Sequence, residues 1–313
     1  MLRIFPWFIG ALAIFLGLYF SWMKTPLIIG LSYGFAALGV SILIRAGQVS
    51  FGHAGFTCMS GYAMVAALKI WPEIDGLILI LISGLAGLIA GGIVGLFMMR
   101  YRGIFFGMLN LAMSMVLFSL LGKFYHVTGG TDGISFDRPK LLGQLLDRSN
   151  YETALLVLCA FFVVITCSLV QRFYASPTGQ ALIALKSNEV RLEYIGISAK
   201  KVFYKGYVAS ATLCGFAGGI FALVQGLVTP EMGYWVSSGE YVFIAVLGGT
   251  YHAVGAFIGA IGFTFLKLFA AAAMTGAWQL VIGSVLLVLI FVAPNGLVAW
   301  LRKFDRKTSH AQK

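Results

Sequence analysis

Long apolar runs dominate this sequence, and short polar stretches separate them. They lie at residues 4–23, 27–44, 77–99, 104–121, 151–170, 206–227, 241–273 and 278–298. A helix needs about 20 apolar residues to cross the hydrocarbon core of a bilayer. Backbone groups in lipid must be satisfied internally, so only helices or closed barrels can span it. Because a barrel would show short alternating segments instead of long runs, we predict an all-α, polytopic bundle of membrane helices.

Composition agrees with this class. Hydrophobic residues make up 60% of the 313 residues and charged residues only 11%, whereas a soluble domain carries roughly 25% charged residues. Basic loops on one side of a membrane explain the net charge of +11, so nucleic acid is not an expected partner. The lipid bilayer is the expected partner. We expect residues 1–300 to form one transmembrane domain.

One segment, residues 171–205, is polar in a chain that is otherwise apolar. Its charged residues are six basic and two acidic: Arg172, Lys186, Arg191, Lys200, Lys201 and Lys205 against Glu189 and Glu193. Lysine and arginine are retained on the cytoplasmic side during membrane insertion. We therefore expect this segment to be cytoplasmic.

Local signals predict two short helices in this segment. Ser176 is an N-cap followed by a proline, which has no N–H to lose in the first turn. Asn188 caps a second helix with Glu189 in its first turn, and Gly196 ends it in the left-handed conformation. Ser198 begins the next membrane helix. The first helix has an apolar stripe of Ala181, Leu182, Ala184 and Leu185. This pattern favours a docking platform, and a structured loop that contacts only headgroups is the alternative.

Charge also constrains the number of crossings. The tail, residues 301–313, is basic and belongs on the same side as residues 171–205, so an even number of spans must lie between them. The runs 206–227, 241–273 and 278–298 would give three. Splitting the middle run at Gly248–Gly249 gives four, with a broken or short helix near residues 241–255. We predict about ten helices with both termini cytoplasmic, and a re-entrant short helix is the alternative.

Residues 47–68 are less apolar than their neighbours. Gln48, Ser50, His53 and Thr57 share this segment with several glycines. A helix that faces lipid would not tolerate this density of polar groups, so the segment should face protein or a water-filled path. The alternative for His53 is a hydrogen bond to a backbone carbonyl where the helix breaks.

Glycines predict close contacts in two other places. The span 77–99 contains Gly84, Gly87, Gly91, Gly92 and Gly95, and small residues let helix backbones approach each other. The stretch TGGTDGI, residues 128–134, combines glycine with threonine and aspartate, which is typical of a tight, hydrogen-bonded turn.

The sequence carries little reactive chemistry. Its four cysteines lie in apolar segments without CxxC spacing, so we expect buried hydrophobes and neither metal ligands nor disulfides. No nucleophile–base, metal-binding or paired-carboxylate motif indicates an enzyme, and no Walker motif indicates ATP hydrolysis by this chain. We expect no Asp or Glu inside a span, and Lys267 is the only basic residue well inside one.

Four ordered motifs resemble one transporter family. They are GQVSFGHAGF after the second span, the TGGTDGI loop, SPTGQALIALKSNEVRLEYIGIS, and GEYVFIAVLGGTYHAVGAFIGA. On these motifs the chain is similar to the permease subunits of branched-chain amino acid ABC importers, and more closely to the larger, M-type, permease. The resemblance covers nearly all of residues 27–297.

The resemblance implies a bacterial inner-membrane assembly. In this family the permease pairs with a second, homologous permease, two ATPase subunits dock from the cytoplasm, and a periplasmic binding protein delivers the substrate. ATP is then used by the partner ATPase subunits, and this chain needs no cofactor. Residues 171–205 correspond to the ATPase-coupling loop, with matching positions at Ala184, Lys186, Asn188, Glu189 and Gly196. The chain departs from the family at Arg191 and Leu192, where small residues are common, so the contact surface should differ.

The expected mechanism is alternating access driven by the ATPase subunits. The cargo would be branched-chain or related amino acids, and the candidate path residues are Gln48, Ser50, His53 and Thr57. The same permease type also serves urea and short amides. The alternatives from other classes are a secondary carrier or channel for a small polar solute, which normally has membrane-buried carboxylates, and a membrane-bound enzyme.

Overall fold

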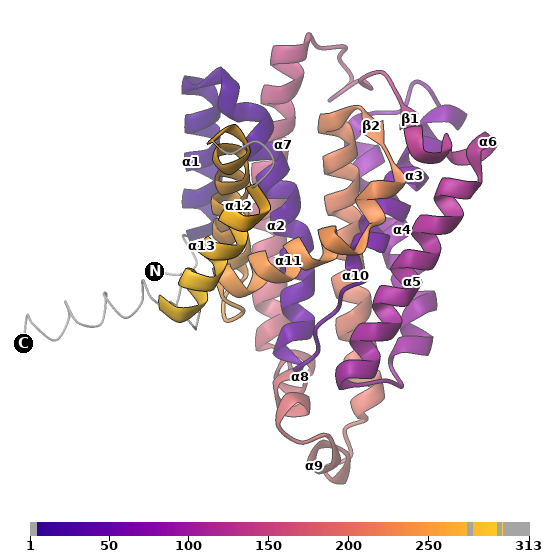
Figure 1. The fold of residues 1–313 in the computed structure, drawn as a ribbon, viewed down its shortest axis with the longest axis vertical. Helices are drawn as coiled ribbons and strands as arrows, with labels where there is room; N and C mark the ends of the chain where they lie inside the picture. The colour runs from indigo at the N-terminus through magenta and orange to yellow at the C-terminus, as the bar shows by residue number, and fades with distance from the viewer. Residues whose placement is uncertain (1–4, 274–277, 293–295, 297–313) are drawn as a thin grey trace, which may run out of the picture.

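The long helices of this chain run side by side along its longest axis (Figure 1). The computed structural model describes residues 5–273, 278–292 and 296. The helices at the expected spans are α1 (Phe5–Tyr19), α2 (Lys24–Arg45), α3 (His53–Ile70), α4 (Gly76–Met98), α5 (Gly103–Lys123), α7 (Arg148–Ala175), α10 (Ala199–Gln225), α11 (Trp235–Gly248), α12 (Ala253–Ala273) and α13 (Trp278–Val292). The connecting elements are η1 (Ser21–Met23), α6 (Tyr125–Thr128), η2 (Gly130–Asp132), β1 (Ile134–Ser135), α8 (Pro177–Ser187), α9 (Glu189–Tyr194), β2 (Leu227–Val228) and η3 (Pro230–Gly233).

The prediction of an all-α helical bundle is confirmed, with one short antiparallel β1–β2 ribbon as the exception in the described ranges. Six helical stretches are long and apolar enough to cross a membrane: Ser21–Arg45, Gly76–Met98, Gly103–Lys123, Arg148–Ala175, Ala199–Gln225 and Ala253–Ala273. The other four expected spans correspond to α1, α3, α11 and α13, which are shorter or more polar.

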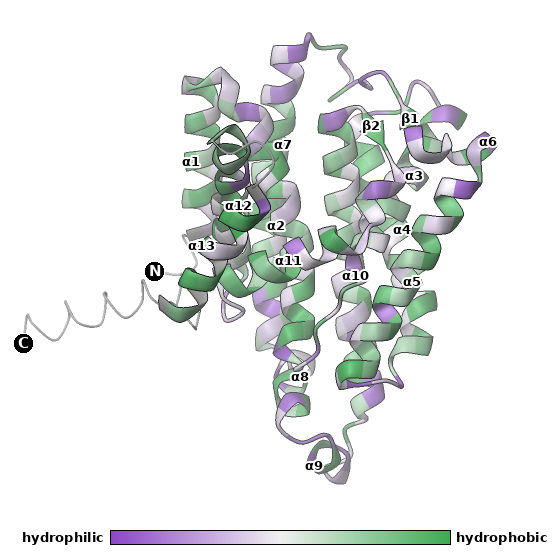
Figure 2. Cartoon of the chain, viewed as in Figure 1, coloured by the Kyte–Doolittle hydropathy of each residue, from purple (hydrophilic) through white to green (hydrophobic). Residues whose placement is uncertain are grey.

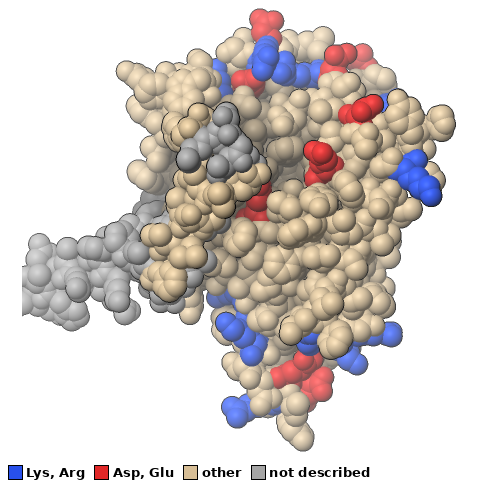
Figure 3. Space-filling view, in the orientation of Figure 1, with Lys and Arg blue, Asp and Glu red and all other residues tan. Residues whose placement is uncertain are grey.

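Charge separates the two ends of the bundle. Hydrophobic residues cover the helices along their length, and hydrophilic residues gather toward both ends (Figure 2). Lysine and arginine outnumber acidic side chains at the end that carries α8 and α9, whereas the opposite end shows both signs and acidic side chains lie in the middle of the visible face (Figure 3). We call the end with α8 and α9 the basic end. The predicted basic tail, residues 301–313, lies outside the described residues.

Helices α2 and α10 form the centre of the bundle. Both are mostly buried, and α10 packs against α2, α3 and α4, while α12 packs against the other side of α2. By contrast α5 buries only Phe106, Asn110 and Ser114, which share one face at helical spacing. The rest of its surface is apolar and open, as expected for a helix that faces lipid or a partner.

Glycine lets α4 approach α10 as the sequence predicts. A methyl group added at Gly87 would lie 2.6 Å from the carbonyl oxygen of Ala211 and 2.8 Å from Cα of Gly215. The four other glycines of this span, Gly84, Gly91, Gly92 and Gly95, also lie against residues of α10. The two backbones therefore cross in direct contact, and no side chain other than hydrogen fits between them.

Two helices begin inside the bundle and not at its ends. In the polar segment 47–68, residues 48–52 are irregular and helix α3 begins only at His53. Helix α11 lies across the middle of the bundle (Figure 1). The break after it falls at Gly249, which has φ +87°, close to where charge parity predicted it. The expected start near Tyr241 was wrong, because the chain re-enters through β2 and η3 and becomes helical at Trp235.

We predict that Gly87→Ala destabilises the bundle, because the new methyl group meets rigid backbone on α10; overpacking of this kind costs about 1–3 kcal/mol. Gly262→Ala is the matched control in α12, where no atom lies within 4 Å of the added methyl group. This control should be neutral or slightly stabilising, since alanine favours the helix. Thermal unfolding of the detergent-solubilised protein tests this, and equal melting temperatures for the two variants would contradict the close crossing.

Candidate functional site

The two short helices at the basic end form as the sequence predicts. Ser176 Oγ accepts a hydrogen bond from the Gly179 amide at 3.2 Å, and Asn188 Oδ1 accepts one from the Arg191 amide at 3.0 Å. Gly196 has φ +81° and so ends α9 in the left-handed conformation. We call α8 and α9 together the platform.

One face of the platform packs inward, and the other is open. Leu182 and Leu185 are buried with Ala181 against α7 and α10. Ala184 was expected to share this stripe, but it faces outward. The open face is partly apolar, since the side chains of Tyr194 and Ile195 are 87% and 67% exposed. Together with Val190, they form a small apolar surface next to charged residues, which is typical of a contact site for another protein.

An ion pair joins the platform to the turn between α4 and α5. The Glu189 carboxylate lies 3.2 Å from Arg102 Nη2. The same guanidinium donates from Nη1 to the carbonyls of Met99 and Tyr101 at 2.8 Å, and it stacks over the ring of Phe203. Because Arg102 is held by four separate contacts, a displacement of α9 acts directly on this turn.

A second contact joins the platform to the segment that leads into α3. Gly47 has φ +75°, and a methyl group there would lie 2.9 Å from the stem of Lys186. The next residue, Gln48, accepts a hydrogen bond from the Gly103 amide at 2.6 Å through Oε1. This places Gln48 between the platform, the start of α5 and the irregular segment 48–52.

The remaining predicted path residues lie in or just before the first turns of α3. Ser50 and His53 are fully buried, and Ser50 Oγ lies 2.6 Å from His53 Nδ1. The imidazole packs against the rings of Phe56 and Tyr207. Its partner is thus a serine hydroxyl and not the backbone carbonyl considered from the sequence. Thr57 Oγ1 donates to the Ala54 carbonyl at 2.7 Å.

Side chains satisfy the backbone where helices begin inside the bundle. Ser238 Oγ of α11 accepts from the Ala54 amide at 2.9 Å, so α11 caps the N-terminus of α3. Ser114, near the middle of α5, donates to the Gly233 carbonyl at 2.7 Å. Irregular backbone at this depth is tolerated only where protein or a water-filled cavity surrounds it.

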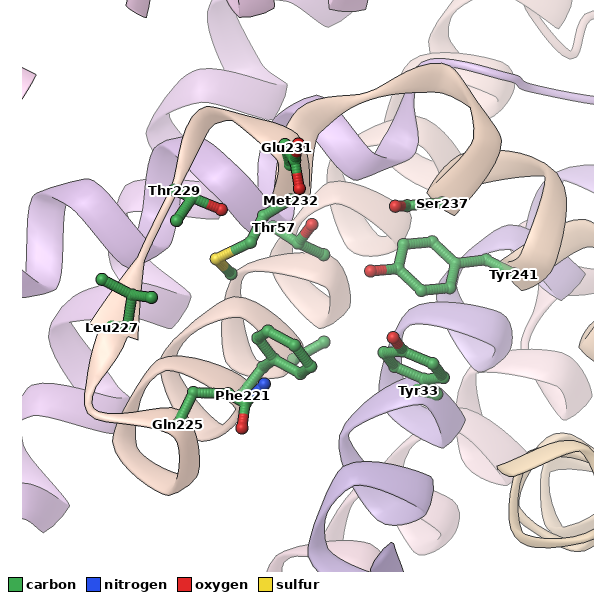
Figure 4. A pocket seen from close by; sticks show the side chains of 11 residues that line it. Tyr33, Thr57, Phe221, Gln225, Leu227, Thr229, Glu231, Met232, Ser237 and Tyr241 are labelled. Atoms are coloured by element: carbon green, nitrogen blue, oxygen red, sulfur yellow. The ribbon is translucent and has the colours of Figure 1, made fainter. Parts of the chain in front are cut away.

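Such a cavity lies beside these breaks. Its volume is about 360 Å³, and α2, α3, α10, α11 and the β2–η3 segment line it (Figure 4). Among the four predicted path residues only Thr57 reaches it; Gln48, Ser50 and His53 lie outside its lining. Sequence reasoning missed the other members because they are distant in the chain: Tyr33, Ala217, Phe221, Gln225, Leu227, Thr229, Glu231, Met232, Ser237 and Tyr241.

A charge pair lies next to this cavity, between α11 and α12. Lys267 Nζ is 2.6 Å from Glu240 Oε1, and the Glu240 side chain is only 12% exposed. The sequence suggests a helix start near Tyr241, but α11 begins five residues before Glu240, so Glu240 lies inside a helix. A largely buried charge requires a partner, and Lys267 is one.

All four cysteines, Cys58, Cys159, Cys167 and Cys214, are buried and free, as predicted. In the described part of the chain no group of three or more His, Cys, Asp or Glu side chains is placed to hold a metal ion.

A helical bundle with broken helices, a cavity beside the breaks and a platform at one end is an architecture typical of membrane transporters. Comparison of the sequence with known families agrees. The family described as branched-chain amino acid transport system permease component matches residues 9–291. The chain belongs to this family.

Named relatives are similar over much of the chain. The high-affinity branched-chain amino acid transport system permease proteins LivM of Salmonella typhimurium and Escherichia coli are each 27% identical over 239 residues, which cover 69% of this chain. The match spans 56% of the length of those relatives. A probable branched-chain amino acid transport permease protein LivH of Methanocaldococcus jannaschii is 24% identical over 273 residues, 82% of this chain and 84% of that protein. No solved structure matches the chain.

We predict that neutralising either member of the Glu240–Lys267 pair destabilises the protein, because it breaks an ion pair whose carboxylate is largely buried. Glu240→Gln and Lys267→Met should each lower the melting temperature, and the double variant should lower it by less than the sum. A coupling of about 1 kcal/mol is typical of contacting residues, and unfolding in mixed SDS micelles measures it. Strict additivity would show that the two side chains do not interact.

Proposed function

We propose that this chain is the membrane-spanning permease subunit of an ATP-driven importer for branched-chain or related amino acids. Family membership supports the transport role, and one observation carries the mechanism: the platform is tied to the helices around the cavity. Glu189 contacts Arg102 at the start of α5, and Gln48 bonds the same turn through Gly103. Gln48 lies five residues before α3, whose Thr57 lines the cavity.

In this proposal the basic end faces the cytoplasm and the platform is the coupling surface for the ATPase subunits. The open face with Val190, Tyr194 and Ile195 would contact the ATPase, because it is apolar and has no partner within the described chain. Of the positions that match the family, Ala184 and Lys186 are exposed on α8, whereas Asn188 and Gly196 set the shape of α9. The departure at Leu192 is directed inward, since that side chain is buried.

Alternating access follows from these contacts. Closure of the ATPase dimer displaces the platform, and the two ties carry this displacement to the start of α5 and to the segment before α3. Helices that begin inside the bundle can tilt about their broken ends without losing a long run of backbone hydrogen bonds. The cavity beside those ends then opens to one side of the membrane at a time.

The partners in the proposal are a second, homologous permease, two ATPase subunits and a periplasmic binding protein in a bacterial inner membrane. Both termini would be cytoplasmic. ATP is hydrolysed by the ATPase subunits, and this chain uses no cofactor of its own. The open apolar face of α5 suits either lipid or the second permease.

We predict that the assembled complex in proteoliposomes takes up leucine only with both ATP and the binding protein. Glu189→Ala and Arg102→Ala should each reduce uptake by about tenfold, because either one breaks the same charge-assisted contact. The double variant should be no worse than Arg102→Ala, which also removes the bonds to the Met99 and Tyr101 carbonyls.

Arg172→Ala is the control, because Arg172 is exposed at the same end and makes no ion pair with a described residue; uptake should stay near wild type. Full uptake by Arg102→Ala would show that the α4–α5 turn does not transmit the motion. Uptake by this chain alone without ATP would replace the importer with a secondary carrier.

A further inference from the structure

The cavity contains a carboxylate that the described part of the chain does not neutralise. Glu231 lines it from η3 and is exposed to it, without a hydrogen bond or ion pair to its side chain from any described residue. Nearby Glu240 is paired with Lys267. A carboxylate without a partner in the protein must be solvated by water or paired with a cationic ligand.

The walls of the cavity differ in chemistry. Ser237 and the two tyrosines, Tyr33 and Tyr241, direct hydroxyl groups into it from one side (Figure 4). Phe221 and Met232 give an apolar surface on the other side, next to the polar side chains of Gln225 and Thr229, and Glu231 lies at the edge (Figure 4). The cavity thus offers a negative charge, a group of hydroxyl donors and an apolar surface within one small volume.

Size restricts the ligand further. Pockets for small molecules are typically about 300–1,000 Å³, and this one, at about 360 Å³, is near the lower limit. It therefore suits one small molecule. A bare inorganic cation would make no use of the apolar surface, and an anion would be repelled by Glu231.

Resting on the proposed function, we propose that this cavity is a binding site within the permease for the zwitterion of an aliphatic amino acid. Glu231 receives the ammonium group through a charge-assisted hydrogen bond. The hydroxyls of Tyr33, Ser237 and Tyr241 donate to the carboxylate, and Phe221 and Met232 contact the aliphatic side chain. Urea and short amides fit poorly, because they carry no positive charge for Glu231 and no side chain for the apolar surface.

Leucine binding without the binding protein tests this site directly. The assembled complex in nanodiscs is mixed with leucine, and saturation-transfer difference NMR detects weak contact. We expect a leucine signal, a weaker signal from isoamylamine, which lacks the carboxylate, and none from 4-methylpentanoate or urea, which lack the ammonium group. Equal signals from leucine and 4-methylpentanoate would overturn the role of Glu231.

Variants at Glu231 separate this inference from the proposed function. Glu231→Gln should reduce leucine affinity and uptake by about tenfold, the loss expected for one charge-assisted contact, while Glu231→Asp keeps the charge and should recover part of both. ATP hydrolysis stimulated by the loaded binding protein should persist in Glu231→Gln, which shows that the complex is folded and assembled. Wild-type binding and uptake by Glu231→Gln would refute the site and leave the importer intact. Failure of the wild-type complex to import any amino acid would refute the importer itself.

Discussion

Every backbone polar group at membrane depth needs a partner, and this chain meets that requirement with side chains from neighbouring helices. Helix α3 begins inside the bundle, where Ser238 of α11 accepts from the Ala54 amide in its first turn. The re-entrant segment before α11 is held by Ser114. Gln48 bonds the start of α5. These three bonds let the chain open a cavity among helices that otherwise pack through glycine, and they make the positions of α3, α5 and α11 depend on one another.

The arrangement connects the surface at the basic end with the interior of the bundle. Glu189 and Arg102 are 87 residues apart in sequence, yet their ion pair joins the platform to a turn between two spans. Its charge-assisted bond fixes the position of the platform relative to this turn. The cavity lies beyond these contacts, where two helix ends meet, which is the position where a small change in tilt alters access most.

Much of the fold is determined by local sequence signals and could therefore be predicted. Apolar runs located the spans, Ser176, Asn188 and Gly196 set the ends of the platform helices, and charge parity located the break at Gly249. The predictions that failed concern features that depend on contacts between residues distant in the chain. Glu240 sits in a sequence that resembles a loop, and its place inside a helix follows from a re-entrant path that no periodicity reveals. The cavity gathers residues from five elements, so only Thr57, which lies in a visibly polar segment, was identified in advance. The departures from the family pattern at Arg191 and Leu192 did not indicate that the side chain of Leu192 is buried.

Accessibility of the cavity from the two sides of the membrane tests the central claim most directly. The four native cysteines are buried, so a cysteine introduced as Ser237→Cys is the main target for an impermeant thiol reagent added to one side of proteoliposomes that contain the complex. Alternating access predicts that labelling changes from one side to the other when ATP hydrolysis is trapped with vanadate. Labelling from the same side in both states would contradict the account.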